Sequence, residues 1–590
     1  MNARFPFLCQ AAVALLGLIS LGNVRAEEPR VVVVVQSAES LLGDLEHMVA
    51  DLAGRREDWD NSVFPNIDIF LIGVDKTQPV RYDQIMGAAG GRREQLMVPI
   101  DNLDDFINGN LDPLGIVVKQ ERRQKDLYKL SDVYEGWMRI KENYARLAVK
   151  DHPEDVPADM PHPSATHAEL LALGYDVAAQ LDNSKTTAEQ RQAAFAAFRD
   201  NTLAGIQQRP DETQEQFQLR QTNTQQSMAT MERLFVESSL VTIGWTTDAD
   251  KGVGKLVLAA VPETPLATTL KLQGTKASRF AGVAKPEDPV LAGRLNYVLD
   301  ELAIGQFGEL YKLSRPAMEQ RIDKTEGLTD EQKKARKEIA GVVLDMLTSS
   351  LELGKWDGAV QLTTQPSGLH TGVLGICAKD GAPVAQIMEL LPAANGRYAT
   401  QLNVDETGDV KIHKLTVTEG YPAALKAFFG DAPDVYVGTG PDTIWVSVGE
   451  GAVDALKAAV AAAAAPPAGE VDPTVASLDL DLLPVLQLMS QLRKDGDFDL
   501  MGMLQSRGMI EEPPAATEGE EEKPGADTAR MLKDFEWRDA AIEALDSQAD
   551  RLHMELKRVD DRLEGETTVE KGILKAIGEV IAKFARENLG

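Results

Sequence analysis

The sequence predicts an α+β fold in which antiparallel sheets are built from repeated β-β-α units, with long helical insertions between the units. Two observations predict this fold. Segments with the alternating pattern of β-strands occur in pairs around short turns, and a helical segment follows each pair. The same order recurs four times between residues 240 and 586. Because a short turn joins antiparallel neighbours, each pair is expected to form a hairpin.

The four expected units share the order strand, turn, strand, helix. They are expected at 240–245, 255–261 and 265–272; at 359–364, 369–377 and 382–391; at 435–438, 444–448 and 452–464; and at 552–556, 563–569 and 573–586. In such a sheet one face can pack on its own helices, while the other face meets water or a second sheet.

Residues 1–26 have the composition of a cleavable secretory signal peptide. A basic start at Arg4 precedes an apolar run over 5–21, and Val24-Arg25-Ala26 forms a cleavage site. The alternative is an anchor that stays attached to the membrane, but the apolar run is short for a membrane span. We therefore expect export, with the mature protein periplasmic or extracellular after cleavage near Ala26.

The remaining chain divides by composition. Residues 27–150 are expected to form an α+β domain that opens with a buried strand at 31–35 and a helix at 38–54 capped by Ser37. Another strand is expected at 67–74. The other expected parts are a Pro-rich linker at 151–164, a helical hairpin insertion at 165–237, a central α+β domain at 238–465 with a helical insertion at 290–353, and a C-terminal α+β domain at 466–590 with a disordered acidic loop at 511–525.

The chain is strongly acidic, with a formal net charge of −31. Such a charge repels nucleic-acid phosphates, so binding of DNA or RNA is not expected. It suits a solvated surface, cation binding or a basic partner. No segment after residue 26 has 18 uninterrupted apolar residues, so no stable membrane span is expected.

Four short segments are notable: Gly73-Val74-Asp75-Lys76-Thr77-Gln78-Pro79, residues 98–106, Phe428-Phe429-Gly430 and residues 445–449. They resemble segments of a loosely defined group of uncharacterised exported proteins of planctomycete-type bacteria. The resemblance implies export, and it carries over no functional residue.

No catalytic motif is present in the usual sequence forms. Gly252-Val253-Gly254-Lys255 is followed by Leu256 and a strand, whereas a phosphate loop needs a Ser or Thr and then a helix. Ser447 lacks the glycines of a nucleophile elbow. We therefore predict no catalytic residue and no cofactor. Cys377 remains the single cysteine after cleavage, and its place in an alternating strand favours a buried, unreactive thiol.

Two groups of residues are weak candidates for metal ligands. Imidazole and carboxylate groups gather in the Pro-rich segment that contains His152, His162 and His167, although a solvated linker is the favoured interpretation of this segment. The carboxylates of Asp495, Asp497 and Asp499 alternate as in a calcium loop, but Leu500 and Ser506 replace its glycine and glutamate.

These observations favour a non-catalytic exported protein that binds a protein or a cell-envelope component. The first alternative is a carrier of an apolar ligand such as a lipid, since curved sheets packed by amphipathic helices can enclose such a ligand. The second alternative is a hydrolase that uses carboxylates or a metal.

Overall fold

The structure is a computed structural model, and it divides the chain into two compact units. Unit 1 comprises Met1–Gln207, Ser227–Thr268 and Asp561–Gly590, and unit 2 comprises Gln208–Gln226 and Thr269–Asp560. The described residues are 30–86, 92–149, 156, 158, 162, 168–184, 186–209, 212–431, 434–465, 471–494, 539–545 and 549–588. The predicted signal peptide and the acidic loop at 511–525 lie outside them.

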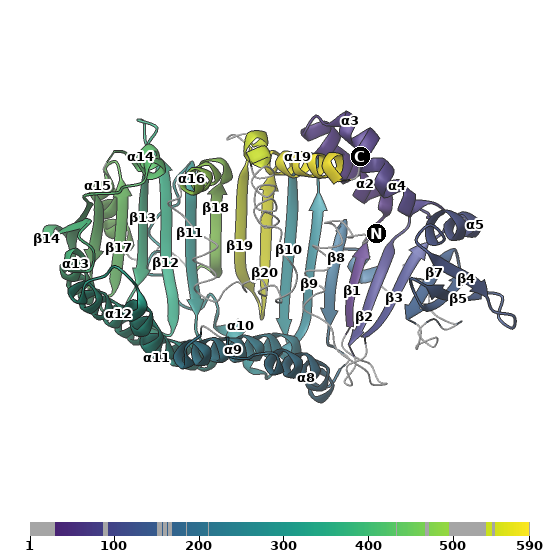
Figure 1. The fold of residues 1–590 in the computed structure, drawn as a ribbon, viewed down its shortest axis with the longest axis horizontal. Coiled ribbons are helices and arrows are strands. Elements are labelled where there is room, and N and C mark those ends of the chain that lie inside the picture. The colour runs from purple at the N-terminus through teal and green to yellow at the C-terminus, as the bar shows by residue number, and fades with distance from the viewer. Residues whose placement is uncertain are drawn as a thin grey trace. The chain divides into compact units, whose positions relative to one another are not determined.

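Unit 1 contains an antiparallel sheet (Figure 1). In spatial order its strands are β20 (Arg562–Glu570), β10 (Lys251–Ala260), β9 (Ser238–Thr247), β8 (Val177–Asp182), β1 (Arg30–Val35), β2 (Val80–Met86), β3 (Arg92–Pro99), β7 (Tyr144–Val149), β6 (Gly136–Lys141), β5 (Leu127–Asp132) and β4 (Ile116–Gln120).

Helices of unit 1 cover both faces of its central strand β1. Leu170 of α7 packs with Val32 and Val34 on one face, and Phe195 of α8 packs on Val31 on the other. The helices that reach into this unit are α2 (Ala38–Glu46), α3 (Arg56–Asp58), α4 (Phe64–Asp68), α5 (Leu103–Asp105), α7 (Ala168–Leu171), α8 (Ala188–Ala204), the second half of α9 (Gln214–Glu237), the first half of α10 (Pro265–Leu272) and α19 (Lys571–Asn588).

Unit 2 contains a second antiparallel series of strands. In spatial order these are β19 (Arg551–Val559), β18 (Thr474–Asp481), β11 (Pro289–Val298), β12 (Lys355–Thr364), β13 (His370–Cys377), β17 (Thr443–Gly449), β16 (Val435–Thr439), β15 (Val410–Val417) and β14 (Tyr398–Thr407).

The helices of unit 2 lie near the two ends of these strands. Figure 1 shows α11 (Glu301–Lys324), α12 (Asp330–Ser350) and α13 (Pro383–Ala394) along one end, and α14 (Ala423–Phe429) and α16 (Leu482–Lys494) along the other. A further helix, α15 (Ala452–Ala464), packs on the strands themselves. No helix among the described residues is long and apolar enough to cross a membrane.

The α+β class and the antiparallel pairing predicted from the sequence are confirmed. At each of the four expected places the chain forms two strands and then a helix, namely β9–β10–α10, β12–β13–α13, β16–β17–α15 and β19–β20–α19. Helices α8 and α12 each begin with a capping box. Thr187 exchanges hydrogen bonds with Gln190 in α8, and Thr329 does so with Gln332 in α12. Ser37 caps α2 as expected.

The strand predicted at 67–74 is wrong. Residues Phe64–Asp68 form α4 and Ile69–Leu71 form a 3-10 turn, with only Val74 making an isolated bridge to Ile100. Ile69, Phe70 and Ile72 are exposed by 40% or more. The apolar run had suggested a strand, but no strand among the described residues forms a ladder with this segment.

Two predicted helical insertions contain strands at their starts. The insertion at 290–353 begins with β11 and only then continues into α11 and α12. The hairpin at 165–237 contains β8 before α8 and α9. The strand expected at 255–261 begins earlier, since β10 already starts at Lys251.

The close packing around Gly375 of β13 provides a test of the core of unit 2. A Cβ atom at Gly375 would lie 2.5 Å from the Phe280 ring and 2.6 Å from the Trp445 ring. We expect Gly375→Ala to lower the free energy of unfolding of unit 2 by about 1–3 kcal/mol, because the core would be overpacked. Gly305→Ala is the control, since nothing lies within 4 Å of that Cβ and alanine favours the helix. Urea unfolding compares them, and equal stabilities of both variants would contradict the expectation.

Candidate functional site

The register of unit 2 assigns its side chains to two faces. Residues paired directly across neighbouring antiparallel strands point to the same side, and successive residues of one strand point to opposite sides. Asp357 and Ala359 of β12 therefore share a face with Cys377 and Val373 of β13 and with Trp445 of β17. We call this side the closed face and the opposite side the open face.

The closed face is covered by α15 and by the segment 276–285. Leu456 and Val460 of α15 pack in one cluster with Phe280, Trp445 and Ile412. The rings of Phe280 and Trp445 meet edge to face with centroids 5.2 Å apart, a preferred arrangement for an aromatic pair. This cluster is the main core of unit 2.

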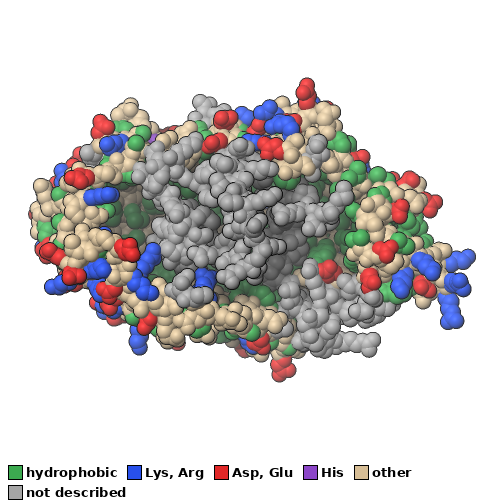
Figure 2. Space-filling view, in the orientation of Figure 1, with side chains coloured by type: hydrophobic (Ala, Val, Ile, Leu, Met, Phe, Trp, Pro, Cys, Tyr) green, Lys and Arg blue, Asp and Glu red, His purple; other side chains and the backbone are tan. Residues whose placement is uncertain are grey.

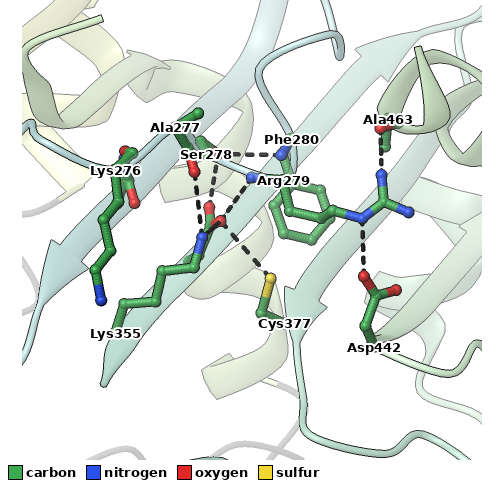
Figure 3. A network of polar contacts seen from close by, with 11 residues as sticks. Lys276, Ala277, Ser278, Arg279, Phe280, Lys355, Cys377, Asp442 and Ala463 are labelled. Atoms are coloured by element: carbon green, nitrogen blue, oxygen red, sulfur yellow. Dashed lines mark hydrogen bonds and ion pairs between the residues drawn. The ribbon is translucent and has the colours of Figure 1, made fainter. Parts of the chain in front are cut away.

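The buried carboxylate of Asp357 holds the segment 276–285 on the sheet, and Figure 3 shows its three partners Ser278, Arg279 and Lys355. Its side chain is 0% exposed. The Ser278 hydroxyl donates to Oδ1 at 2.6 Å, while the Arg279 backbone N–H and the Lys355 ammonium each donate to Oδ2 at 2.7 Å. A buried carboxylate needs such partners, because losing its hydration costs several kcal/mol.

Arg279 and Asn296 hold the same segment at further points. The Arg279 guanidinium donates to Asp442 at 3.1 Å and to the Ala463 carbonyl at the end of α15. The Asn296 amide donates to the Lys276 carbonyl at 2.7 Å. These polar groups are occupied in fixing the fold, so we assign the network around Asp357 a structural role.

The Cys377 thiol belongs to this network and is poorly suited to nucleophilic chemistry. Its Sγ lies 3.6 Å from the Asp357 carboxylate. Burial, followed by the negative charge of Asp357, raises the pKa of Cys377 to about 12. At neutral pH the thiol is protonated, and only the thiolate is a good nucleophile.

The open face is apolar across six neighbouring strands. Its side chains come from β19, β18, β11, β12, β13 and β17, and they are Leu552, Met554, Leu556, Leu478, Leu480, Leu291, Leu295, Tyr297, Trp356, Val360, Leu362, Leu374, Ile376, Val446 and Val448, with Gly293, Gly358 and Gly372 among them. Leu295, Trp356, Leu374, Ile376 and Met554 are 38–42% exposed. Large exposed apolar patches are uncommon on soluble proteins and are typical of interaction surfaces.

Helices on the open side form two walls around this floor. The ring of Phe307, in α11, lies 4.6 Å from the ring of Trp356. Met388 of α13 packs on Val437 and Ile444, which belong to the open side. At the other end of the strands, Phe428 of α14 stacks on His370 with centroids 3.9 Å apart. Figure 2 shows hydrophobic side chains in the hollow at the left, between the two rows of helices.

The dimensions of the floor follow from strand geometry. Strands of ten residues such as β11 and β12 are about 33 Å long, and six strands spaced about 4.8 Å apart span roughly 24 Å. The hydrocarbon part of one bilayer leaflet is about 15 Å thick. The open face is therefore long and wide enough for several extended acyl chains.

Two smaller clefts open beside α15. One of about 250 Å³ is lined by alanines of α15 together with Val283, Gln361 and Val373. The other, of about 360 Å³, contains Asp434 and Glu450. Both acids are engaged, since Asp434 accepts from Lys414 at 2.7 Å and Glu450 accepts from Ser367. Neither cleft presents converging groups with an evident reaction.

Most of the sequence-predicted metal candidates lie outside the described residues. This applies to Asp495, Asp497 and Asp499 and to His152 and His167. His162 is described, and its ring packs edge-on against Tyr144 with centroids 4.9 Å apart. Among the described residues, no three His, Cys, Asp or Glu side chains are close enough together to hold a metal ion.

The two sequence motifs weighed as catalytic have structural positions. Gly252 and Gly254 lie within β10, and a Cβ at Gly252 would come 2.3 Å from the Trp245 ring. The glycines make room for that indole, so their presence is explained by packing and requires no bound phosphate. Ser447 is fully buried in β17.

No protein-family model, curated protein or solved structure matches the chain.

Unit 1 contains a carboxyl pair that sequence reasoning missed. Asp44 of α2 faces Asp176, which also accepts from the Ser40 hydroxyl at 3.0 Å and from the Thr247 N–H at 2.7 Å. Burial raises the pKa of Asp44 to about 7, and the charge of Asp176 and a hydrogen bond to it act in the same direction. The two carboxyls lie 132 positions apart, so only the fold reveals the pair.

The raised pKa of Asp44 predicts a pH dependence of stability. A carboxyl whose pKa is higher in the folded state stabilises at low pH, and this contribution is lost as pH rises from about 4 to about 7. We expect Asp44→Asn to raise the free energy of unfolding at pH 8 and to change it little at pH 5. Urea unfolding at both values measures this, with the exposed Glu39→Gln of the same helix as control. An equal response of both variants would argue against the pair.

The environment of Cys377 predicts slow thiol chemistry. In a Cys9→Ser variant Cys377 is the sole thiol. With a pKa of about 12 instead of about 8.5, we expect its reaction with a disulfide reagent at pH 8 to be at least ~100-fold slower in the folded chain than in urea. Comparable rates in the two states would show that the thiol is not held as described.

Proposed function

We propose that this chain is an exported, non-catalytic protein that binds the acyl chains of a lipid on the open face of unit 2. One observation carries the proposal: six adjacent strands present aliphatic, aromatic and glycine residues to solvent, between helical walls. A ligand that covered this surface would gain about 25 cal/mol of binding free energy for each Å² of apolar area removed from water.

The chemistry of the floor favours hydrocarbon over a protein partner. Typical protein interfaces make about one hydrogen bond per 100–200 Å². Backbone groups of the internal strands are already paired in the ladders, and the middle of the floor offers no charged side chain. Acyl chains need no hydrogen-bond partner, so they match this surface. A protein that inserts apolar side chains is the competing occupant, and the experiment below distinguishes it.

The acidic and nucleophilic groups near the sheet support a binding role rather than a hydrolytic one. Asp357 is occupied by Ser278, Arg279 and Lys355, and the high pKa of Cys377 keeps its thiol protonated. Neither group is poised to activate water or to attack a substrate.

Export remains part of the proposal, on the composition of residues 1–26 and on the resemblance to exported planctomycete-type proteins. We also propose that the hairpins with their helices are repeats of one β-β-α unit. Three such sets follow one another in unit 2, namely β12–β13–α13, β14–β15–α14 and β16–β17–α15. Repetition of this kind extends one apolar face over many strands.

The test is binding of tritiated palmitic acid to the delipidated chain by equilibrium dialysis. We expect Leu374→Asp to weaken binding at least ~10-fold, because a carboxylate would be desolvated beneath the ligand. Leu374 is 40% exposed without ligand, so the melting temperature should change little.

Val404→Asp is the matched control, since Val404 is also 40% exposed in unit 2 but lies on β14, away from the floor. Equal losses in both variants, or no palmitate binding by the native chain, would overturn the proposal. Retention of a protein, with no lipid, in material purified from the producing cell would favour the competing occupant.

A further inference from the structure

The open face has a polar pair at one end. Thr364 and His370 lie directly opposite each other in the β12–β13 register, on the same side as Leu362 and Leu374. The Thr364 hydroxyl and His370 Nδ1 are 3.2 Å apart. These two residues close the apolar floor at the end where α14 forms the wall.

An aromatic group occupies the opposite end of the same strands. Trp356 is the first residue of β12 on the open side. The centroid of its ring lies 4.6 Å from that of Phe307 and 6.4 Å from that of Tyr297. Tyr311 extends the group along α11, with its ring 6.2 Å from that of Phe307. The floor is therefore polar at one end and aromatic at the other.

The distance between the two ends suits one lipid molecule. Trp356 and Thr364 are eight residues apart on one strand, which corresponds to about 26 Å. Half of a bilayer, headgroup included, is roughly 20–22 Å thick. A single extended acyl chain with its headgroup therefore covers most of the distance between the aromatic group and the polar pair.

Glycines shape the path between the two ends. Gly358 of β12 and Gly372 of β13 both lie on the open side. A Cβ at Gly358 would approach Ile376 Cγ2 at 3.4 Å, and one at Gly372 would approach Leu362 Cδ1 at 3.6 Å. Without these Cβ atoms the floor is lower between its larger side chains, which leaves room for an extended chain along β12 and β13.

His370 can serve as a hydrogen-bonding partner rather than as a charge. Its ring stacks on Phe428, and burial lowers its pKa, so the imidazole is neutral at pH 7. When the Thr364 hydroxyl donates to Nδ1, Nε2 carries the proton and can donate to a carboxyl or ester oxygen. In the other tautomer Nε2 accepts from a hydroxyl.

We propose that the ligand lies along β12 and β13 in one orientation, with its oxygen-bearing head at His370 and Thr364 and its hydrocarbon end at Trp356 and Phe307. This inference rests on the proposed function and adds a direction and a head-recognising pair to it. The ligand class is an amphiphile with a single-chain length of about 20 Å and an oxygen acceptor or donor at its head.

Fluorescence quenching by spin-labelled stearic acids tests the orientation. The readout is the Trp356 emission, taken as the difference between the native chain and Trp356→Phe. We expect 16-doxyl-stearic acid, labelled near its methyl end, to quench this emission at least twofold more strongly than 5-doxyl-stearic acid, labelled near its carboxyl. Stronger quenching by the 5-doxyl probe, or equal quenching by the two, would overturn the orientation. Failure of both probes to bind would instead contradict the proposed function.

A second measurement tests the head-recognising pair. We expect His370→Ala to weaken dodecanoic acid binding about three- to tenfold, the effect of one lost hydrogen bond, and to leave dodecane binding unchanged. His553→Ala is the matched control, because His553 lies on the opposite face of β19 and contacts Asp479 at 2.9 Å. Equal losses for acid and alkane, or the same loss in His553→Ala, would remove His370 from head recognition.

Discussion

The anchoring of segment 276–285 by the buried Asp357 carboxylate decides which face of unit 2 is covered. Ser278, Arg279 and Lys355 all donate to that carboxylate. The segment they hold carries Phe280 into the core beneath α15. Because an uncompensated buried carboxylate would cost several kcal/mol, this arrangement is stable only while the segment stays in place. The covering layer is therefore fixed on one face, and the other face is left to the helices at its two ends.

The two units differ in how helices cover the faces of their apolar strands. In unit 1, β1 is a run of five valines with helices on both faces, so that α7 covers Val32 and Val34 while α8 covers Val31. In unit 2, β12 and β13 also carry apolar residues on both sides. Among the described residues, Phe307, Met388 and Phe428 contact the open side of this sheet near the strand ends. An apolar surface that the described fold does not cover is the physical basis of the lipid-binding proposal.

The residues that hold the core and the proposed ligand surface lie on opposite faces of the sheet. Groups with strong chemistry, such as Asp357 and Cys377, lie on the closed face and are occupied by contacts that hold the core. The open face combines weakly interacting hydrocarbon with a single hydrogen-bonding pair at one end. Hydrocarbon burial supplies affinity without direction, whereas a hydrogen bond at one end supplies direction at a small cost in free energy.

The sequence by itself determined the α+β class, the hairpins, the helix cap at Ser37 and the composition typical of export, because these depend on local periodicity, capping chemistry and composition. It misjudged residues 67–74, since an apolar run does not show whether a partner strand exists. Only the tertiary structure decided which side of β12 is open and brought Asp44 to Asp176 and His370 to Phe428. Strand register and helix docking depend on contacts between residues far apart in the chain, and a local pattern does not specify them.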